Sequence, residues 1–249
     1  MSSYHPAFKV PSNENIKIWR YMDFTKFVSM LERGGLFFPR AELLGDPFEG
    51  SLPLANRLLL ESLPPGVDKI PKEAREASSS FRRWLPRWTF ISCWHMNEIE
   101  SAGMWSLYGR DDKAVAIQST YKRIRAALDE NVHIGEVNYI DYTTEAIRED
   151  NTFFTFTHKR KSFEHERELR AVISDIPVKD SPYEGPPIDY DKPVVAGVWR
   201  EVELKDLLET AYVSPGSPGW FTELVKGVLS RYGLDIPVTQ SSLDEDPVY

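Results

Sequence analysis

Alternating apolar and polar positions predict a first strand and a first helix near the start of the chain. Residues 16–21 alternate in the manner of a half-buried strand. Asp23 then suits a helix N-cap, and an apolar stripe follows it on one helical face. Gly34 and Gly35 favour a left-handed turn, so we expect the helix to end near Arg33.

Similar patterns continue along the chain without a regular strand–helix–strand rhythm and without an internal repeat. They favour an α+β fold on a mixed or antiparallel sheet with flanking helices. We expect a loose N-terminal arm over residues 1–15 and a single domain over residues 16–249. Further strands are predicted at 36–39, 89–94, 114–117, 132–142, 169–174, 194–202, 211–214 and 236–239, further helices at 51–86 (broken at 64–66), 98–108, 121–129 and 220–231, and a long loop at 177–193.

The composition is that of a globular protein, with 41% hydrophobic and 12% aromatic residues among 249. No apolar run reaches the roughly 18 residues of a membrane span. The N-terminus lacks the basic and apolar regions of a secretory signal. The single cysteine, Cys93, excludes an internal disulfide and a thiolate zinc cluster. We therefore expect a cytoplasmic protein.

The formal net charge of −8 argues against a protein that grips nucleic acid with its whole surface. Two local basic clusters stand out against this average, one within residues 82–88 and one at residues 158–161. Either suits a phosphate-bearing partner, because aromatic residues beside arginine favour stacked bases. The alternative is a solvated helix face in each case.

The acidic stretch at residues 163–170 is the most informative part of the sequence. As a strand, it places Glu164, Glu166, Glu168 and Arg170 on one face, with Glu166 and Glu168 about 7 Å apart. Like charges this close need a cation, a ligand or water to relieve their repulsion, so the row is a candidate site. The alternative is an amphipathic helix in which Glu166 and Arg170 form an i,i+4 pair.

Several standard sites are absent from the sequence. It contains no Walker A loop, dinucleotide fingerprint, HExxH helix or GxSxG elbow. Cys93 and His95 stand two apart on a predicted strand, which is too few ligands for zinc. A buried structural cysteine is the favoured interpretation of Cys93.

A set of short motifs lies along residues 16–175. The motifs are Trp19-Arg20-Tyr21, Gly35-Leu36-Phe37-Phe38, Asp46-Pro47-Phe48-Glu49, Ser92-Cys93-Trp94-His95, Met104-Trp105-Ser106-Leu107-Tyr108 and Lys161-x-Phe163-x-x-Glu166-x-Glu168-Leu169-Arg170. Together with residues 240–244, this set resembles an uncharacterised bacterial family, the domain of unknown function 2971 (DUF2971). The family's name implies no activity.

A second resemblance rests on an arginine on the first strand, a serine on a later strand and a Glu-x-Glu pair. In this chain these are Arg20, Ser92 and Glu166-x-Glu168. The set is similar to the scheme of the ADP-ribosyltransferase fold, which implies a split sheet, NAD as the substrate and no metal. The chain departs from the scheme at the usual Ser-Thr-Ser run, which is Ser92-Cys93-Trp94 here, and in its long spacing to the Glu pair.

The resemblance implies a role for each residue in binding NAD. Arg20 would hold the pyrophosphate, as a planar guanidinium does well. Ser92 would donate a hydrogen bond to the nicotinamide ribose or its neighbour. Tyr21 or Trp94 would stack on the nicotinamide ring.

The two glutamates would carry the chemistry. Glu168 would bind the ribose 2′-hydroxyl and stabilise the positive charge that develops as nicotinamide departs. Glu166 would orient or deprotonate the acceptor nucleophile. The chain would then transfer ADP-ribose to a macromolecule, protein or nucleic acid, or to water, in the setting of a toxin or a phage-defence effector.

Two other classes of function remain open from the sequence. Asp46 or Glu49, together with Glu166 and Glu168, would suit Mg²⁺ in a nuclease whose basic clusters hold the phosphate backbone. A non-catalytic binding module of a bacterial defence system is the second alternative. It predicts that Arg20, Ser92 and Glu168 lie apart in space.

Overall fold

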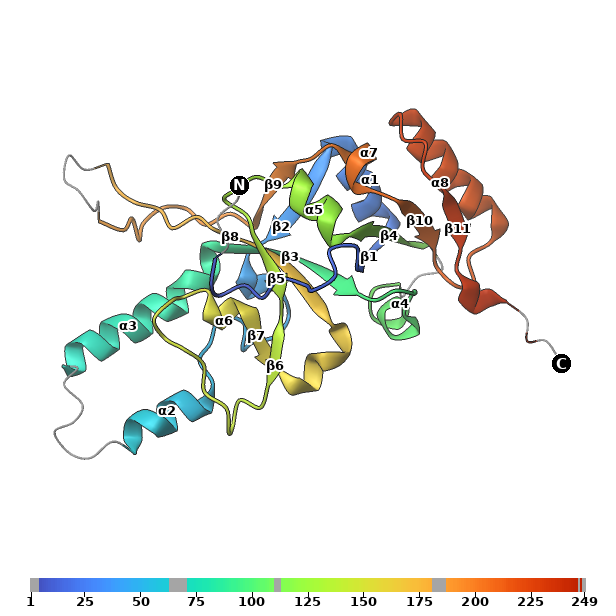
Figure 1. The fold of residues 1–249 in the computed structure, drawn as a ribbon. Helices are drawn as coiled ribbons and strands as arrows, with labels where there is room; N and C mark the ends of the chain where they lie inside the picture. The colour runs from blue at the N-terminus through green and yellow to red at the C-terminus, as the bar shows by residue number, and fades with distance from the viewer. Residues whose placement is uncertain (1–4, 63–70, 110–112, 181–186, 246, 248–249) are drawn as a thin grey trace.

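A central sheet of seven strands organises the protein (Figure 1). The computed structural model describes residues 5–62, 71–109, 113–180, 187–245 and 247. The strand order is β11-β10-β4-β1-β3-β8-β5, and every pair is antiparallel except β10 with β11. The predicted α+β class with a mixed, mainly antiparallel sheet is therefore confirmed. The strands are β1 (Lys17–Asp23), β3 (Thr89–Met96), β4 (Ala114–Thr120), β5 (His133–Glu136), β8 (Glu168–Ser174), β10 (Thr210–Val213) and β11 (Val238–Gln240).

Two small sheets accompany the central one. β2 (Gly35–Pro39) pairs antiparallel with β9 (Gly197–Glu201), although the two strands are far apart in sequence. β6 (Asn138–Ile140) pairs parallel with β7 (His158–Arg160). Both small sheets supply residues to the candidate site described below.

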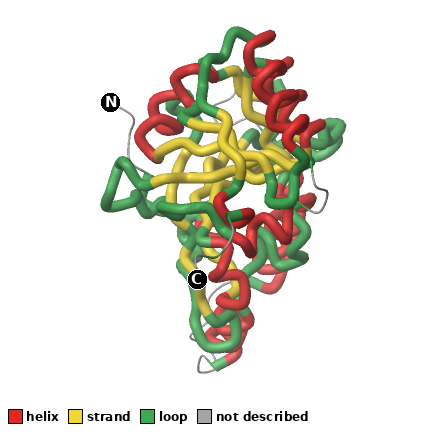
Figure 2. Tube along the Cα trace, turned by 90° about the vertical axis from the view of Figure 1, so that its right-hand side faces the viewer, coloured by secondary structure: helices red, strands yellow, loops and turns green. Residues whose placement is uncertain are grey.

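Helices surround the sheet, with the strands gathered at the centre of the molecule (Figure 2). α2 and α3 project together from one side of the body (Figure 1). No helix in the described part of the chain is long and apolar enough to cross a membrane. The helices are α1 (Phe24–Arg33), α2 (Leu54–Glu61), α3 (Lys72–Trp84), α4 (Ala102–Tyr108), α5 (Tyr121–Ala127), α6 (Phe154–Thr157), α7 (Leu204–Leu207) and α8 (Gly219–Arg231), with short 3-10 turns η1 (Ala41–Leu43), η2 (Leu85–Arg87), η3 (Lys161–Glu166) and η4 (Ser242–Asp244).

The central sheet is split between β1 and β3. These strands pair only at Ile18 with Met96 and at Trp19 with His95. Beyond that point β1 remains paired with β4 along its whole length, while β3 remains paired with β8 as far as Thr89. The two halves of the sheet therefore diverge from a short common stem, and a fork opens between them.

Alternation along β1 directs neighbouring side chains to opposite faces of the sheet. Ile18 and Met22 belong to the main apolar core, which also contains Trp94 of β3. Trp19 and Tyr21 belong to a smaller apolar cluster on the other face. Residues on both sides of the sheet consequently border the fork.

The strand predicted for residues 163–170 is confirmed only from Glu168 onward, and the alternative amphipathic helix is wrong. Residues 161–166 form η3, Arg167 adopts a left-handed conformation with φ of 40°, and β8 begins only at Glu168. The turn at Arg167 breaks the alternation that a continuous strand needs. Glu166 therefore lies outside the strand, and its position depends on Lys159, with which it forms an ion pair.

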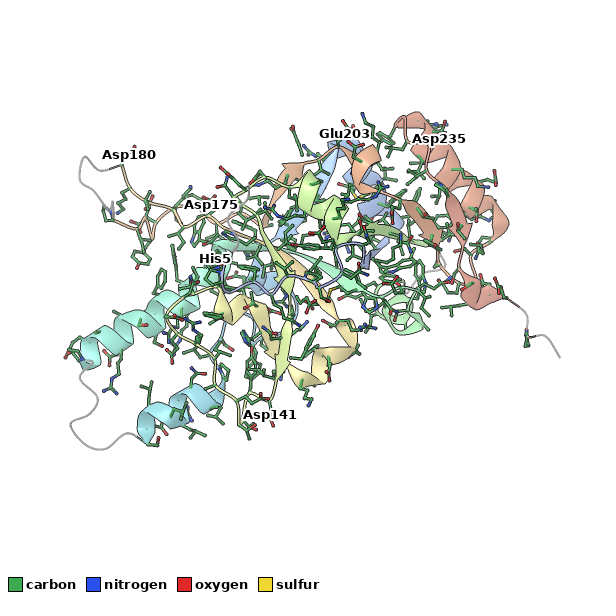
Figure 3. The ribbon with its side chains drawn as sticks, viewed as in Figure 1. His5, Asp141, Asp175, Asp180, Glu203 and Asp235 are labelled. Carbon is green, nitrogen blue, oxygen red and sulfur yellow. The ribbon has the colours of Figure 1, made fainter. Side chains whose placement is uncertain are left out.

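The N-terminal arm is packed against the body over its described residues rather than loose. Ala7 and Phe8 are buried, and Lys9 forms a β-bridge with Glu136 of β5. His5, labelled in Figure 3, packs its ring 4.9 Å from the ring of His133. Aromatic packing thus holds the arm on β5.

Other differences are shifts in element boundaries. The helix predicted from residue 98 begins at Ala102, where Ser101 accepts a hydrogen bond from the Met104 amide as the N-cap. The last strand spans Val238–Gln240 rather than 236–239. The predicted helix break at 64–66 lies outside the described residues, as do residues 181–186 of the predicted loop.

Candidate functional site

A cavity of about 650 Å³ occupies the fork between β1 and β3. Arg20 and Trp94 reach it from the main-core face of the sheet. Tyr21, His95 and Glu168 reach it from the opposite face, where His95 and Glu168 are direct cross-strand neighbours. Because the lining combines both faces, the cavity passes through the split in the sheet.

Arg20 presents a cation without a charged partner to this cavity. Its Nη2 donates to the Phe37 carbonyl oxygen at 2.9 Å, and the guanidinium carbon lies 5.9 Å from the Trp94 ring centroid. Among the described residues it forms no ion pair, and burial lowers the pKa of its guanidinium. A half-buried guanidinium in this state is suited to an anionic ligand group, above all a phosphate.

Glu168 lies in a network of buried charges at the start of β8. Its Oε1 accepts from Lys159 Nζ at 2.7 Å, and its Oε2 accepts from Arg170 Nε at 2.5 Å. Lys159 also donates to Glu166. The two terminal nitrogens of Arg170 donate to the two oxygens of Glu49 at 2.6 and 2.9 Å. Lys159 thus joins the two glutamates of the predicted site, and all five residues line the cavity.

The two glutamates differ in protonation. Burial alone would raise the pKa of Glu168, but the charges of Arg170 and Lys159 hold it well below its usual range. Burial, a hydrogen bond with Glu168 and the charge of Glu168 raise the pKa of Glu166 to about 7. One carboxylate is therefore ionised near neutral pH while its neighbour exchanges a proton there, which is the pattern that acid–base chemistry requires.

Replacing Glu166 with glutamine is expected to remove a pH dependence of stability between pH 4.5 and about 7. The folded protein holds the Glu166 proton across this window, whereas the unfolded chain releases it. The stabilising contribution is full below pH 4.5 and is lost as the pH rises through about 7. Urea unfolding across the window measures the slope in the wild type, in Glu166→Gln and in Glu164→Gln, an exposed control in η3. Equal slopes in all three proteins would contradict the raised pKa.

Tyr21 and Trp94 form aromatic walls of the cavity, and both are buried. The Tyr21 hydroxyl accepts from the Ser101 amide at 2.9 Å, and its ring meets the Trp105 ring edge-on at 4.9 Å. Burial raises the pKa of Tyr21, so this phenol remains neutral. The walls are therefore fixed before any ligand binds.

Ser92 is the predicted site residue that does not reach the cavity. It is 0% exposed, and its hydroxyl accepts from the Trp94 indole nitrogen at 3.2 Å. It pairs with Ala171, on the strand face opposite to Cys93 and Glu168. The fold brings together Arg20, Tyr21, Trp94, Glu166 and Glu168, and leaves Ser92 behind Trp94.

Cys93 and His95 share one face of β3, as alternation predicts, and both line the cavity. Burial raises the pKa of Cys93, so it remains a thiol rather than a nucleophilic thiolate. His95 Nδ1 donates to the Glu166 carbonyl oxygen at 2.7 Å. His95 thus fixes the backbone at the end of η3, a role that the sequence did not indicate.

The acidic residues of the site are held by cations of the chain. Asp46 accepts from Arg160 at 2.7 Å, and Glu49 is held by both terminal nitrogens of Arg170. Within the described ranges, no group of three or more His, Cys, Asp or Glu residues is placed to hold a metal ion. The other basic cluster is also engaged, since Arg82 pairs with Glu149 at 2.7 Å. Arg82, Lys159 and Arg160 of the two basic clusters therefore pair with carboxylates of the protein, whereas Arg83 and Lys161 are exposed.

Comparisons with known proteins add one distant likeness. A scan against protein-family models finds no match, so the resemblance to DUF2971 stays a prediction. A search of curated proteins also finds no match. Among solved structures, the chain is similar to DarT of Thermus sp. 2.9, determined in complex with carba-NAD⁺, with a TM-score of 0.40 and 9% sequence identity. The alignment covers 93% of this chain and 98% of the DarT chain, and a likeness this distant carries no argument about activity.

Proposed function

We propose that the protein cleaves the glycosidic bond between nicotinamide and ribose in NAD. The observation that supports this most strongly is that a cationic and an anionic side chain line the same cavity. An arginine that forms no ion pair with any described residue and an ionised glutamate both border the split in the sheet. NAD carries an anionic pyrophosphate and, during cleavage, a cationic ribose, so the two charges of the site suit two parts of one ligand.

Binding uses the residues on both faces of the fork. Arg20 holds the pyrophosphate through the guanidinium nitrogens that do not bond the Phe37 carbonyl. Tyr21 borders the nicotinamide end on the face that carries Glu168, and Trp94 lines the cavity beside Arg20 on the other face. Ser92 acts as a positioning residue, because its hydroxyl fixes the Trp94 indole instead of meeting the ribose directly.

Glu168 and Glu166 divide the chemical step. As the bond between ribose C1′ and the nicotinamide nitrogen breaks, its electron pair leaves with nicotinamide, and the Glu168 carboxylate stabilises the cationic ribose. The acceptor nucleophile then bonds to C1′ and gives its proton to Glu166. A pKa of about 7 makes Glu166 a suitable base at neutral pH. Lys159 keeps the two carboxyl groups adjacent during the transfer.

The ADP-ribose passes to a macromolecular acceptor, protein or nucleic acid, or to water. The proposal includes membership of the DUF2971 family. It also includes a biological role as a toxin or as a phage-defence effector. The arrangement does not favour a metal-dependent nuclease, because Arg160 and Arg170 already bond Asp46 and Glu49, the carboxylates that would complete a Mg²⁺ site with the Glu pair. It does not favour a purely structural role for Arg20 either, because a structural arginine of this burial is normally paired.

Replacing Arg20 with alanine is expected to lower kcat/KM for nicotinamide release by about a hundredfold, through the loss of a charge-assisted phosphate contact. The assay incubates the purified protein with NAD labelled in the nicotinamide ring and with candidate acceptors. Arg33→Ala, which removes an exposed arginine at the end of α1, is the matched control and is expected to match the wild type. Background release by the wild type and both variants would refute the proposed function.

A further inference from the structure

Two aromatic rings lie side by side where the small sheet of β2 and β9 meets the cavity. Phe37 and Trp199 are register partners across these strands, and their ring centroids lie 5.2 Å apart at an interplanar angle of 49°. Both side chains line the cavity and are only half-buried. Unlike Tyr21 and Trp94, which are almost fully buried, these rings keep surface that a ligand can cover.

This aromatic pair is tied directly to Arg20. The carbonyl oxygen of Phe37 accepts from Arg20 Nη2 at 2.9 Å, so the pair lies beside the guanidinium. Arg20 projects toward the main-core face of β1, whereas Tyr21 projects toward the face that carries Glu168. A ligand phosphate at Arg20 therefore lies between the aromatic pair on one side and the glutamates on the other.

We propose that Phe37 and Trp199 form a subsite for a purine base, which binds the adenine of NAD and fixes the direction of the dinucleotide in the cavity. The inference rests on the proposed function. Cleavage requires the nicotinamide ribose to lie at Glu168, on one face of the sheet. With the pyrophosphate at Arg20, the adenosine half of NAD then passes through the split to the other face. The face of an aromatic side chain is a common stacking partner of a nucleobase, and either ring of the pair offers such a face.

The surroundings of the pair suit the rest of an adenosine. Ser29 of α1 also lines the cavity and offers a hydroxyl to a ribose or to a ring nitrogen. Lys26, one turn earlier on α1, also lines the cavity and adds a positive charge to it, although it forms an ion pair with the half-buried Asp23. The glutamates of the opposite side, by contrast, disfavour the electron-rich edge of a purine.

Replacing Trp199 with leucine tests binding of the adenine half of the ligand separately from binding of the nicotinamide half. We expect ADP-ribose, which contains adenine, to bind about tenfold more weakly, because one stacking partner is lost. Nicotinamide mononucleotide, which lacks adenine, is expected to bind as it does to the wild type. Isothermal titration calorimetry measures both affinities. Trp220→Leu on α8 is the matched control, since Trp220 is 56% exposed and lies outside the cavity lining.

Competition in the wild type gives a second measurement that needs no variant. Adenosine is expected to displace ADP-ribose and to leave nicotinamide mononucleotide bound. Displacement of both ligands, or of neither, would overturn the adenine subsite, as would equal weakening of both ligands by Trp199→Leu. If the wild type binds NAD but gives one of these results, the adenine subsite is overturned and the proposed function is retained. If the wild type binds none of NAD, ADP-ribose and nicotinamide mononucleotide, the adenine subsite and the proposed function are both overturned.

Discussion

Nicotinamide release is expected to fall by about a thousandfold when Glu168 is replaced with glutamine. The amide cannot supply the negative charge that stabilises the cationic ribose, although it occupies nearly the same space. Release of labelled nicotinamide under saturating NAD measures kcat directly. Glu164→Gln is the matched control, since Glu164 lies in η3 with its side chain exposed and outside the cavity lining.

Binding measurements separate a catalytic loss from a folding defect. Several tryptophans line the cavity, including Trp94 and Trp199, so their fluorescence reports on NAD binding. We expect Glu168→Gln to bind NAD within about threefold of the wild type while kcat collapses, because Glu168 acts mainly in the transition state. A variant that keeps wild-type turnover would contradict the role of Glu168.

Replacing Arg170 with methionine is expected to reduce the free energy of unfolding by about 3–5 kcal/mol. Arg170 is 1% exposed and bonds Glu168, Glu49 and the Phe156 carbonyl oxygen. Its removal leaves Glu49 and Glu168 buried without its charge, and in the described part of the chain Lys159 forms an ion pair with Glu168 but not with Glu49. Urea or guanidinium unfolding, followed by circular dichroism, measures the loss.

An exposed ion pair provides the comparison for this prediction. Arg148 pairs with Asp150 on the surface, where solvent screens the interaction, so Arg148→Met is expected to leave the free energy of unfolding close to that of the wild type. The prediction fails if Arg170→Met and Arg148→Met destabilise the protein equally. It also fails if the Arg170 variant gains stability, since the charges of the network would then be a net cost.

The sequence predicts the elements whose signals are local. Asp23 accepts from the Lys26 amide at 2.8 Å, and Gly34 adopts φ of 55°, so α1 begins and ends where its capping residues predict. The helix at Trp220 is confirmed within one residue of its start. Strands rich in β-branched and aromatic residues, such as β3 and β4, are also predicted at nearly their observed positions.

The site depends on long-range contacts that local patterns do not encode. Glu166 lies near Glu168 because Lys159 bonds both, and not because they share a strand. The sequence around Lys159 predicts a basic cluster that is available to a partner or to solvent, yet Lys159 is buried. Its position depends on the pairing of β7 with β6, which periodicity in residues 158–161 does not indicate.

The split of the sheet and the aromatic pair at its border are likewise tertiary features. The sequence shows that β1 and β3 are strands, but not that they pair over only two positions. Phe37 and Trp199 stand more than 150 residues apart and meet only because β2 pairs with β9. Ser92 shows the opposite case, in which a local pattern already limits what the motif can mean. Its motif predicts a ligand contact, whereas alternation along β3 directs its side chain away from the cavity.

The most direct test of the account is a crystal structure of the protein with a non-cleavable NAD analogue. We predict density in the fork between β1 and β3, with the pyrophosphate against Arg20 and the nicotinamide ribose beside Glu168. Density for the analogue elsewhere on the protein, with Arg20 and Glu168 both free of it, would contradict the central claim.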